Sequence, residues 1–422
     1  MLGNPRAGRD GRGRQTASLR QSTQTEQIHG ASKALGLAAL AFFTCFYVWS
    51  LYGPLSPAIQ HDLALSEVQL GWLVAIPVVL GSVMRVPMGV LTDRYGARRT
   101  FPALMAFTSL PLAAVAIWHA SFASVVAFGF LLGFAGSSFA IGVPYVSRWY
   151  SKERQGFALG VYGMGMGGSV LTALTAPTIA QRWGLSAMFV LGAVLVLVVG
   201  AVFLVLAEEP PGPRPAVVSL TAPFRVFQTQ GRAWALSLFY FLLFGGFVAM
   251  FLYLPKLLVG VHRLGVADAG ARAAGFALLA VLARPLGGYL ADRIGAQRVL
   301  LVCFGGTTLL ACGLAAGYTN MVQLTLFCLP MAVMFGLGTG AVFKLVALEF
   351  PAQVGAVTGV VGAAGGLGGF FPPLVMALVK SVTGVYTLGF VLLAVTSLAC
   401  LVILLRMGSA PARSATGAVS TS

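Results

Sequence analysis

The chain has 422 residues, of which 58% are hydrophobic and only 9% are charged, and its mean hydropathy is +0.88. Soluble domains carry about 25% charged residues, so this composition indicates a polytopic membrane protein and excludes a disordered chain, a collagen-like chain and a secreted disulfide scaffold. The net charge is +16. Most of the Lys and Arg residues fall in the N-terminal segment and in alternate loops, as the positive-inside rule describes. We therefore expect both termini in the cytoplasm, the lipid bilayer as surroundings, and no nucleic-acid partner.

Twelve apolar segments follow one another along the chain, each near the ~20 residues that a bilayer crossing needs. They are 34–59, 69–92, 99–118, 122–147, 155–180, 184–206, 234–258, 270–291, 298–317, 321–348, 354–379 and 384–406. A proline-rich stretch separates the sixth segment from the seventh. The predicted organisation is a disordered cytoplasmic tail (1–33), a six-helix half (34–206), a cytoplasmic linker (207–233), a second six-helix half (234–406) and a second disordered tail (407–422).

The two halves repeat one another at a constant offset of 199 residues. Arg85 corresponds to Arg284 at this offset, Asp93 to Asp292, and Gly163 to Gly362. Two pseudo-symmetric six-helix halves with a site between them at the middle of the membrane are typical of secondary transporters. The predicted fold class is therefore an all-α polytopic membrane protein with twelve transmembrane helices.

The loop between the second and third segments carries a charged motif, and the second half carries a copy of it. The first copy begins at Gly89 and contains Asp93, Arg94, Gly96 and Arg99. This pattern resembles the loop signature of the major facilitator superfamily. The copy runs from Gly288 to Arg298 and contains Asp292 and Arg293. Because the charges lie at helix ends, where they can clamp neighbouring helices, we assign both copies to gating and not to substrate contact.

Arg85 and Arg284 each precede the aspartate of their motif by eight residues, which places them about 12 Å into the membrane. An arginine at that depth is costly and normally faces an interior cavity. All eleven acidic residues lie in tails, loops or helix ends, so no carboxylate is available at the same depth. A small anion held by the two planar guanidinium groups would satisfy both charges. The alternative is a purely structural role.

No pattern of residues suggests catalysis or a cofactor. The five cysteines form no CxxC pair, and the four histidines lie in the tail, in loops or at span ends. No Ser/His/Asp, Cys/His, metal-binding or paired-carboxylate arrangement falls at membrane depth. We therefore expect no enzyme activity, no metal and no cofactor.

Glycine-rich runs occupy the fifth and eleventh segments, at 160–168 and 359–369. Small residues on a membrane helix let neighbouring helices pack closely. A bare backbone also lets a helix approach a small substrate and slide during a transport cycle. These runs do not favour a phosphate-binding loop, because no Gly-Lys-Ser/Thr follows and they lie at membrane depth.

The aromatic stretch Phe46-Tyr-Val-Trp-Ser-Leu-Tyr-Gly-Pro in the first segment, the two arginines and the glycine runs together resemble the nitrate/nitrite porters of the major facilitator superfamily. The resemblance covers essentially the whole chain after residue 34. It implies that the two arginines grip a planar anion, and that glycines and aromatic rings line the site. By position these are Phe46, Phe139, Gly163, Gly167, Tyr240, Phe244, Gly362 and Gly366. For each ring, packing against lipid or within the core is the alternative.

The chain departs from the family pattern at two positions. Met166 stands where some members carry an asparagine that can donate to the anion, and Lys344 stands where others carry a glutamine. Lys344 is about one turn from Glu349, so an ion pair between them is one interpretation. The other is a third positive group near the pathway that couples transport to protons.

The function that the resemblance implies is transport of nitrate, and also of nitrite, across a bacterial inner membrane. We expect a monomer whose anion site opens alternately to the two sides of the membrane. We favour proton-coupled uptake, as in the assimilatory members of the family, over exchange of nitrate for nitrite. The alternatives are a carrier of another small anion, such as cyanate, formate or a short organic acid, and a membrane anion receptor that does not transport.

Overall fold

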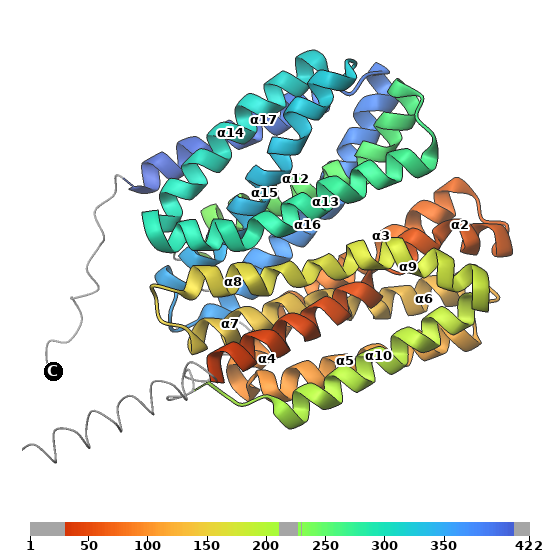
Figure 1. The fold of residues 1–422 in the computed structure, drawn as a ribbon, viewed down its shortest axis with the longest axis horizontal. Helices are drawn as coiled ribbons and strands as arrows, with labels where there is room; N and C mark the ends of the chain where they lie inside the picture. Colours follow the sequence, from red (N-terminus) through yellow and green to blue (C-terminus); the bar gives the residue numbers. More distant parts are fainter. Residues whose placement is uncertain (1–29, 211–226, 229, 409–422) are drawn as a thin grey trace, which may run out of the picture.

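The computed structural model describes residues 30–210, 227–228 and 230–408, and within these ranges the ordered elements are helices with no strand. Eleven segments are long and apolar enough to cross a membrane. One of them, Asp268–Gly317, has 50 residues and would be about 75 Å long if straight, against a hydrocarbon core of ~30 Å. It contains two predicted spans, 270–291 and 298–317, and the chain reverses direction between α13 (Val266–Leu290) and α14 (Ala296–Gly317), as Figure 1 shows. The all-α transmembrane fold class is confirmed.

The first half contains the helices up to residue 206. Its first span is Gly30–Leu63 and ends in α2 (Tyr52–Leu63), and the following elements are α3 (Glu67–Val83), α4 (Arg85–Tyr95), α5 (Ala97–Ile117), α6 (Phe122–Leu132), the 3₁₀ segment η1 (Gly133–Ser138), α7 (Phe139–Trp149), α8 (Gln155–Gly163), the 3₁₀ segment η2 (Met164–Gly167), α9 (Gly168–Trp183) and α10 (Leu185–Leu206).

The second half repeats this succession of long helices. Its elements are α12 (Gly231–His262), α13 (Val266–Leu290), the π-helical segment η3 (Ala291–Gly295), α14 (Ala296–Gly317), α15 (Met321–Glu349), α16 (Val354–Thr383) and α17 (Thr387–Gly408). The predicted tails and linker lie mainly outside the described residues. Of the predicted tails, residues 30–33 and 407–408 are helical.

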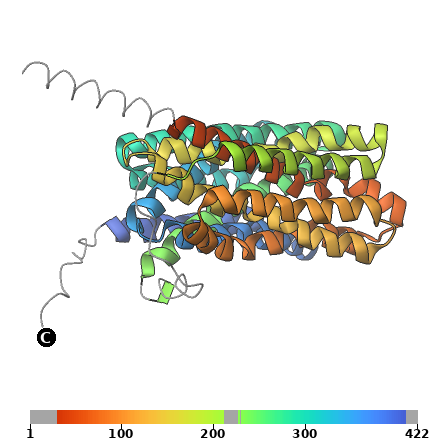
Figure 2. The ribbon, with the colours of Figure 1, turned by 90° about the horizontal axis from the view of Figure 1, so that it is seen from below.

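The two halves lie side by side with their helices running along a common direction, as the two perpendicular views show (Figures 1 and 2). We call the end of the bundle that carries Gly96 and Gly295 the motif end, and the end that carries Leu63, His262 and Met321 the far end. Gly96 (φ +81°) and Gly295 (φ +91°) adopt the left-handed region, which glycine enters without steric cost. Each glycine therefore permits the tight turn between two spans that its motif needs.

The outside of the bundle is apolar, as expected of a protein that faces lipid. Val205, Leu309 and Val322 expose 72–74% of their surface. Trp118 and Trp183, which end their helices at the far end, are 60% and 68% exposed, and tryptophan is enriched where a membrane meets water. Among the described residues, the buried charged side chains lie where the two halves meet; these are Arg85, Asp93, Arg284 and Lys344.

Candidate functional site

Arg85 and Arg284 are buried between the two halves, with 2% and 3% of their surface exposed. Arg85 opens α4, and its Nε donates to the carbonyl of Gly136 at 3.2 Å while its Nη1 donates to the carbonyl of Gly362. Arg284 lies on α13, and its Nη1 donates to the carbonyl of Gly163 at 3.2 Å. Each arginine thus reaches a backbone carbonyl on the glycine-rich helix of the opposite half.

The glycine spacing explains how the arginine helices approach so closely. A Cβ atom on Gly163 would lie 3.0 Å from Nε of Arg284, and one on Gly362 would lie 3.2 Å from Cδ of Arg85. One turn earlier on each helix, a Cβ would lie 2.6 Å from the carbonyl oxygen of the same arginine. A larger residue at these positions would push the halves apart, so the glycines bring both guanidinium groups to one place.

Aromatic rings from both halves close around the two guanidinium groups. Phe139 and Tyr240 stack with their centroids 6.0 Å apart, and Tyr240 stacks on Phe244 at 5.3 Å. The Arg284 guanidinium lies 5.9 Å from the Phe139 ring centroid, and that of Arg85 lies 5.5 Å from Phe244. Each arginine therefore faces a ring of the other half, an arrangement that favours a cation.

Three further side chains lie against these rings or against the Arg284 guanidinium, and two of them, Phe343 and Tyr162, were not predicted from the sequence. Phe343 lies 4.7 Å from both Phe139 and Tyr240, ring centroid to ring centroid. Tyr162 stacks near Phe139 at 5.8 Å. The sulfur of Met166 contacts Nη1 of Arg284, so the residue that departs from the family pattern does lie at the arginine. No local motif marks Phe343 or Tyr162, because their role depends on how the helices cross.

Other predicted site residues lie further away. The Phe46 ring packs on Phe42 at 4.5 Å and on Trp49 at 5.0 Å. The Phe42 ring in turn lies 5.4 Å from that of Phe139, so two rings separate Phe46 from Arg284. Gly366 packs against Ser82. A Cβ on Gly167 would meet only ordinary contacts, the nearest at 3.5 Å on Val281. These three residues therefore pack around the site and do not contact the guanidinium groups of Arg85 and Arg284.

Among the described residues, no carboxylate pairs with the guanidinium group of Arg85 or Arg284. The ion pairs in the described part of the chain involve other residues, so the site carries unbalanced positive charge. Nε of Arg284 is buried without a hydrogen-bond partner. A cavity of about 10 Å³ adjoins Arg284, lined by Met166, Phe244, Phe247, Ala280, Phe335, Gly336 and Thr339. That volume holds about one water molecule, so the side chains must rearrange to admit an anion. Within the described ranges no group of His, Cys, Asp or Glu is placed to hold a metal.

At the motif end, each motif aspartate binds the start of a helix in the opposite half. Asp93 accepts a hydrogen bond from the backbone N–H of Ala356 on α16 at 3.0 Å. Asp292 accepts from the N–H groups of Gly156 and Phe157 on α8 at 2.9 and 2.7 Å. A carboxylate at a helix N-terminus satisfies free N–H groups and the helix dipole. These three bonds therefore hold the halves together at this end.

The glycines of the motifs make this contact possible, whereas the motif arginines take little part in it. A Cβ on Gly89 would lie 2.2 Å from the carbonyl oxygen of Gly355, and one on Gly288 would lie 1.9 Å from that of Gly156. The motif arginines lie on the surface; these are Arg94, Arg99, Arg293 and Arg298. The structure is thus closed at the motif end.

The predicted ion pair between Lys344 and Glu349 is wrong. Nζ of Lys344 lies 2.6 Å from Oδ1 of Asp292 and also donates to the carbonyl of Lys152, while Glu349 pairs with Arg232 at 3.2 Å. Five residues along a helix correspond to a rotation of about 140°, so the two side chains point in different directions. The lysine belongs to the closed contact at the motif end.

Comparison with known proteins shows the family to which the chain belongs. The family model of the Major Facilitator Superfamily matches residues 38–371 and 262–421. A probable nitrate/nitrite transporter of Mycobacterium tuberculosis is 40% identical over 88% of this chain and 95% of its own length. A nitrite extrusion protein of Bacillus subtilis is 38% identical over 88% and 93% of the two chains. The chain belongs to the nitrate/nitrite porter family of the major facilitator superfamily.

Further relatives place this porter among transport proteins and not among enzymes. A probable nitrate/nitrite antiporter of Thermus thermophilus is 34% identical over 86% of the porter and 88% of its own length. Among solved structures, the human organic anion transporter MFSD10 superposes with a TM-score of 0.75 at 16% identity, covering 89% of the porter and 99% of that chain. The proton:xylose symporter XylE gives 0.72 at 12% identity, covering 90% and 96%. These two structures share the fold of the porter.

Proposed function

We propose that this porter carries nitrate, and also nitrite, across a bacterial inner membrane as a monomer whose two halves alternate in their access to the two sides. One observation carries the proposal: Arg85 and Arg284 come from opposite halves, are buried together among aromatic rings, and have no carboxylate near them within the described residues. The printed names of the relatives, which are nitrate or nitrite transporters, support the choice of anion.

The anion would take the place of acceptors that the arginines now use. In the closed structure Arg85 donates to the carbonyl of Gly362 and Arg284 to that of Gly163. A guanidinium group matches a flat oxyanion with parallel N–H donors. Nitrate binding would therefore exchange contacts between the halves for contacts to the anion, which leaves the halves free to rotate around it. No bond in the substrate changes.

We propose that the motif end is the cytoplasmic gate and that both termini lie in the cytoplasm, as the distribution of positive charge supports. The bonds of Asp93 and Asp292 to the helices of the opposite half would hold this gate closed. They would break when the porter opens toward the cytoplasm, and would form again when the empty porter returns.

Proton-coupled uptake is the transport mode that we propose first. Lys344 and Asp292 form a buried ion pair, with 6% and 5% of their side chains exposed, at the gate and not at the anion. When the gate opens, Asp292 would lose the N–H groups of α8, and this pair is the group that we propose to couple transport to protons. Charged side chains close to this pair along the chain are those of Lys152, Glu153 and Arg293, and all three are exposed. Exchange of nitrate for nitrite is the second candidate, supported by the name of the Thermus thermophilus relative.

Nitrate entry into proteoliposomes tests both the function and the mode. Purified porter is reconstituted into vesicles that are empty or loaded with nitrite, with and without an inward proton gradient. We expect gradient-driven uptake into empty vesicles. Uptake only into nitrite-loaded vesicles would replace symport by exchange and leave the anion site standing. Absence of nitrate flux in every condition would refute the proposed substrate.

A competition series separates nitrate from other anions. A site built from two opposed guanidinium groups favours a small flat anion, so nitrite should compete with nitrate, whereas a longer dicarboxylate should not. Stronger transport of cyanate or formate than of nitrate would make the porter a carrier of that anion. Saturable nitrate binding without any flux would make it a receptor.

A further inference from the structure

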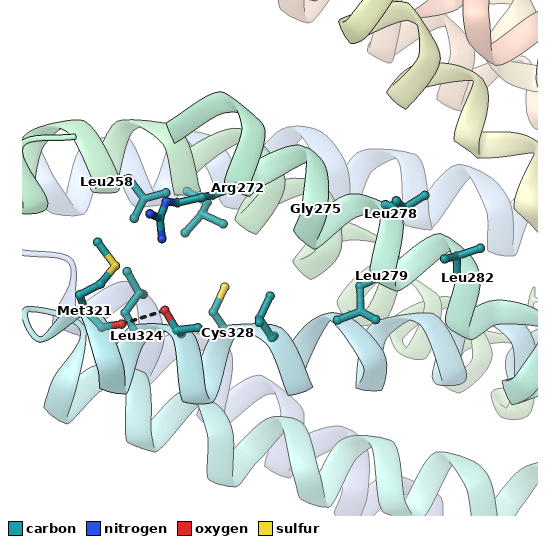
Figure 3. A pocket seen from close by; sticks show the side chains of 12 residues that line it. Leu258, Arg272, Gly275, Leu278, Leu279, Leu282, Met321, Leu324 and Cys328 are labelled. Atoms are coloured by element: carbon teal, nitrogen blue, oxygen red, sulfur yellow. Dashed lines mark hydrogen bonds between the residues drawn. The ribbon is translucent and has the colours of Figure 1, made fainter. Parts of the chain in front are cut away.

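The second half contains a long groove at the far end that the proposed transport cycle does not use. It lies between α12, α13 and α15, has a volume of about 470 Å³, and is shown in Figure 3. Its lining is almost entirely apolar, with Arg272 and Thr325 as the exceptions. It is thus a separate cavity from the one beside Arg284.

The groove exists because α13 and α15 pack tightly only on the motif side. There a Cβ on Gly336 would lie 2.3 Å from the carbonyl oxygen of Ala280, and one on Gly340 would lie 2.3 Å from that of Arg284. Towards the far end the helices diverge, and a Cβ on Gly275 would meet no atom within 4 Å. The wall of α13 therefore has free space beside it at residue 275.

The open side of the groove faces the lipid. Its floor is formed by buried side chains such as Leu258 and Cys328, which are 2% and 3% exposed. Its rims carry Leu278, Leu282 and Leu329, which are 41–53% exposed. Exposed leucines on the outside of a transmembrane bundle contact acyl chains, because the hydrocarbon core of the bilayer contains no water. An acyl chain can therefore enter sideways from the bilayer.

The length of the groove matches one leaflet. From Arg272 to Leu282 the helix α13 advances ten residues, which is about 15 Å. The hydrocarbon core is ~30 Å thick, so the groove extends from the surface of the membrane to about its middle. A single acyl chain of the leaflet at the far end has this reach.

The outer mouth of the groove carries two opposite charges. Nε of Arg272 lies 3.1 Å from Oδ1 of Asp268, one turn earlier on α13, and these side chains are 47% and 51% exposed. Figure 3 shows the Arg272 side chain extending into the space between α13 and α15. A guanidinium group binds a phosphate well, and the adjacent carboxylate suits an ammonium group. A headgroup that carries both charges therefore complements this mouth better than one that is only anionic.

We propose that this groove is a lipid-binding site that holds one acyl chain of a phosphatidylethanolamine from the leaflet at the far end. The lipid phosphate would bind Arg272, and its ammonium group would bind Asp268. The bound chain would fill the gap between α13 and α15 and so support the helix that carries Arg284.

Native mass spectrometry of the purified full-length porter tests the proposal without measuring transport. The protein is exposed in detergent to equal amounts of phosphatidylethanolamine and phosphatidylglycerol, and the retained lipid is counted for each variant. Gly275→Leu fills the groove, and Arg272→Ala removes the proposed phosphate ligand. Gly305→Leu is the matched control, because a Cβ on this glycine of α14 also meets no atom within 4 Å but lies outside the groove.

We expect the unmodified porter and Gly305→Leu to retain one phosphatidylethanolamine in preference to phosphatidylglycerol. Gly275→Leu should lose this lipid, and Arg272→Ala should bind it about two- to fivefold more weakly, as for an exposed charge pair. Equal retention of the two lipids by the unmodified porter would overturn the headgroup assignment. Retention by Gly275→Leu at the level of the control would overturn the site, and a detergent molecule or a second chain retained in place of lipid would do the same.

Discussion

Breaking the ion pair between Lys344 and Asp292 should open the gate at the motif end. The Nζ–Oδ1 distance is 2.6 Å and both side chains are almost fully buried, and removing one partner of such a pair costs about 3–5 kcal/mol. In Lys344→Met, Asp292 keeps the N–H groups of Gly156 and Phe157, so we take the lower value of about 3 kcal/mol. That energy is lost only from the closed state and corresponds to a shift of about 100-fold in the gate equilibrium.

Distance measurements between spin labels on the two halves would detect this shift. Glu153→Cys and Ile294→Cys place labels at exposed positions on either side of the gate, after the five native cysteines are replaced by alanine. We expect a single short distance in the parent protein, and an added longer distance in Lys344→Met. The matched control is Arg232→Met, which breaks the pair with Glu349 at 3.2 Å within one half and should leave the distances unchanged.

Comparing Lys344→Met with Arg232→Met and with Asp292→Asn shows whether the ion pair holds the gate closed. Asp292→Asn should open the gate further than Lys344→Met, because it also weakens the bonds to the start of α8 and leaves the lysine with only the Lys152 carbonyl. If Lys344→Met has the same distance distribution as the parent, the pair does not hold the gate. If Arg232→Met opens it equally, the effect is a general loss of stability and the reasoning fails.

The remaining predictions concern the anion site and its coupling. Arg85→Lys and Arg284→Lys keep the charge but lose the planar fork, so nitrate affinity should fall about 10- to 100-fold; near-normal affinity by titration calorimetry would contradict the site. Gly362→Ala should raise the KM for nitrate severalfold, because its Cβ would lie 3.2 Å from Arg85, whereas Gly167→Ala should leave it unchanged; equal effects in uptake assays would show that the close approach has no role. Lys344→Gln should flatten the pH dependence of uptake, and an unchanged profile would return the lysine to a structural part of the gate.

Much of the architecture could be predicted from the sequence because the relevant signals are local or repeat regularly. The hydrophobic length of each span is set by the thickness of the bilayer, so it can be recognised without knowing how the helices pack. The offset of 199 residues relates Arg85 to Arg284 and Asp93 to Asp292. The repeated halves also predict that each arginine and its opposing glycine helix meet near a pseudo-symmetry axis.

The site in detail was only partly predictable, as particular residues show. Tyr240 and Phe244 are four residues apart, so their stacking at 5.3 Å follows from helix geometry alone. Phe343 joins Tyr240 from α15, whereas Tyr162 of α8 stacks on Phe139. Neither has a local pattern that distinguishes it from other aromatic residues in the spans. Phe46 belongs to a more distinctive sequence motif than these residues, yet the ring of Phe42 separates it from Phe139.

The sequence by itself thus determined the fold class, the repeat and the two buried arginines, because insertion into a bilayer and burial of charge depend on residue type and depth. Only the tertiary structure decided which side chains meet. Lys344 pairs with Asp292, 52 residues earlier, and not with Glu349, five residues later. Ion pairs between helices depend on the angle at which the helices cross and on the direction of each side chain, and neither is encoded within a single helix.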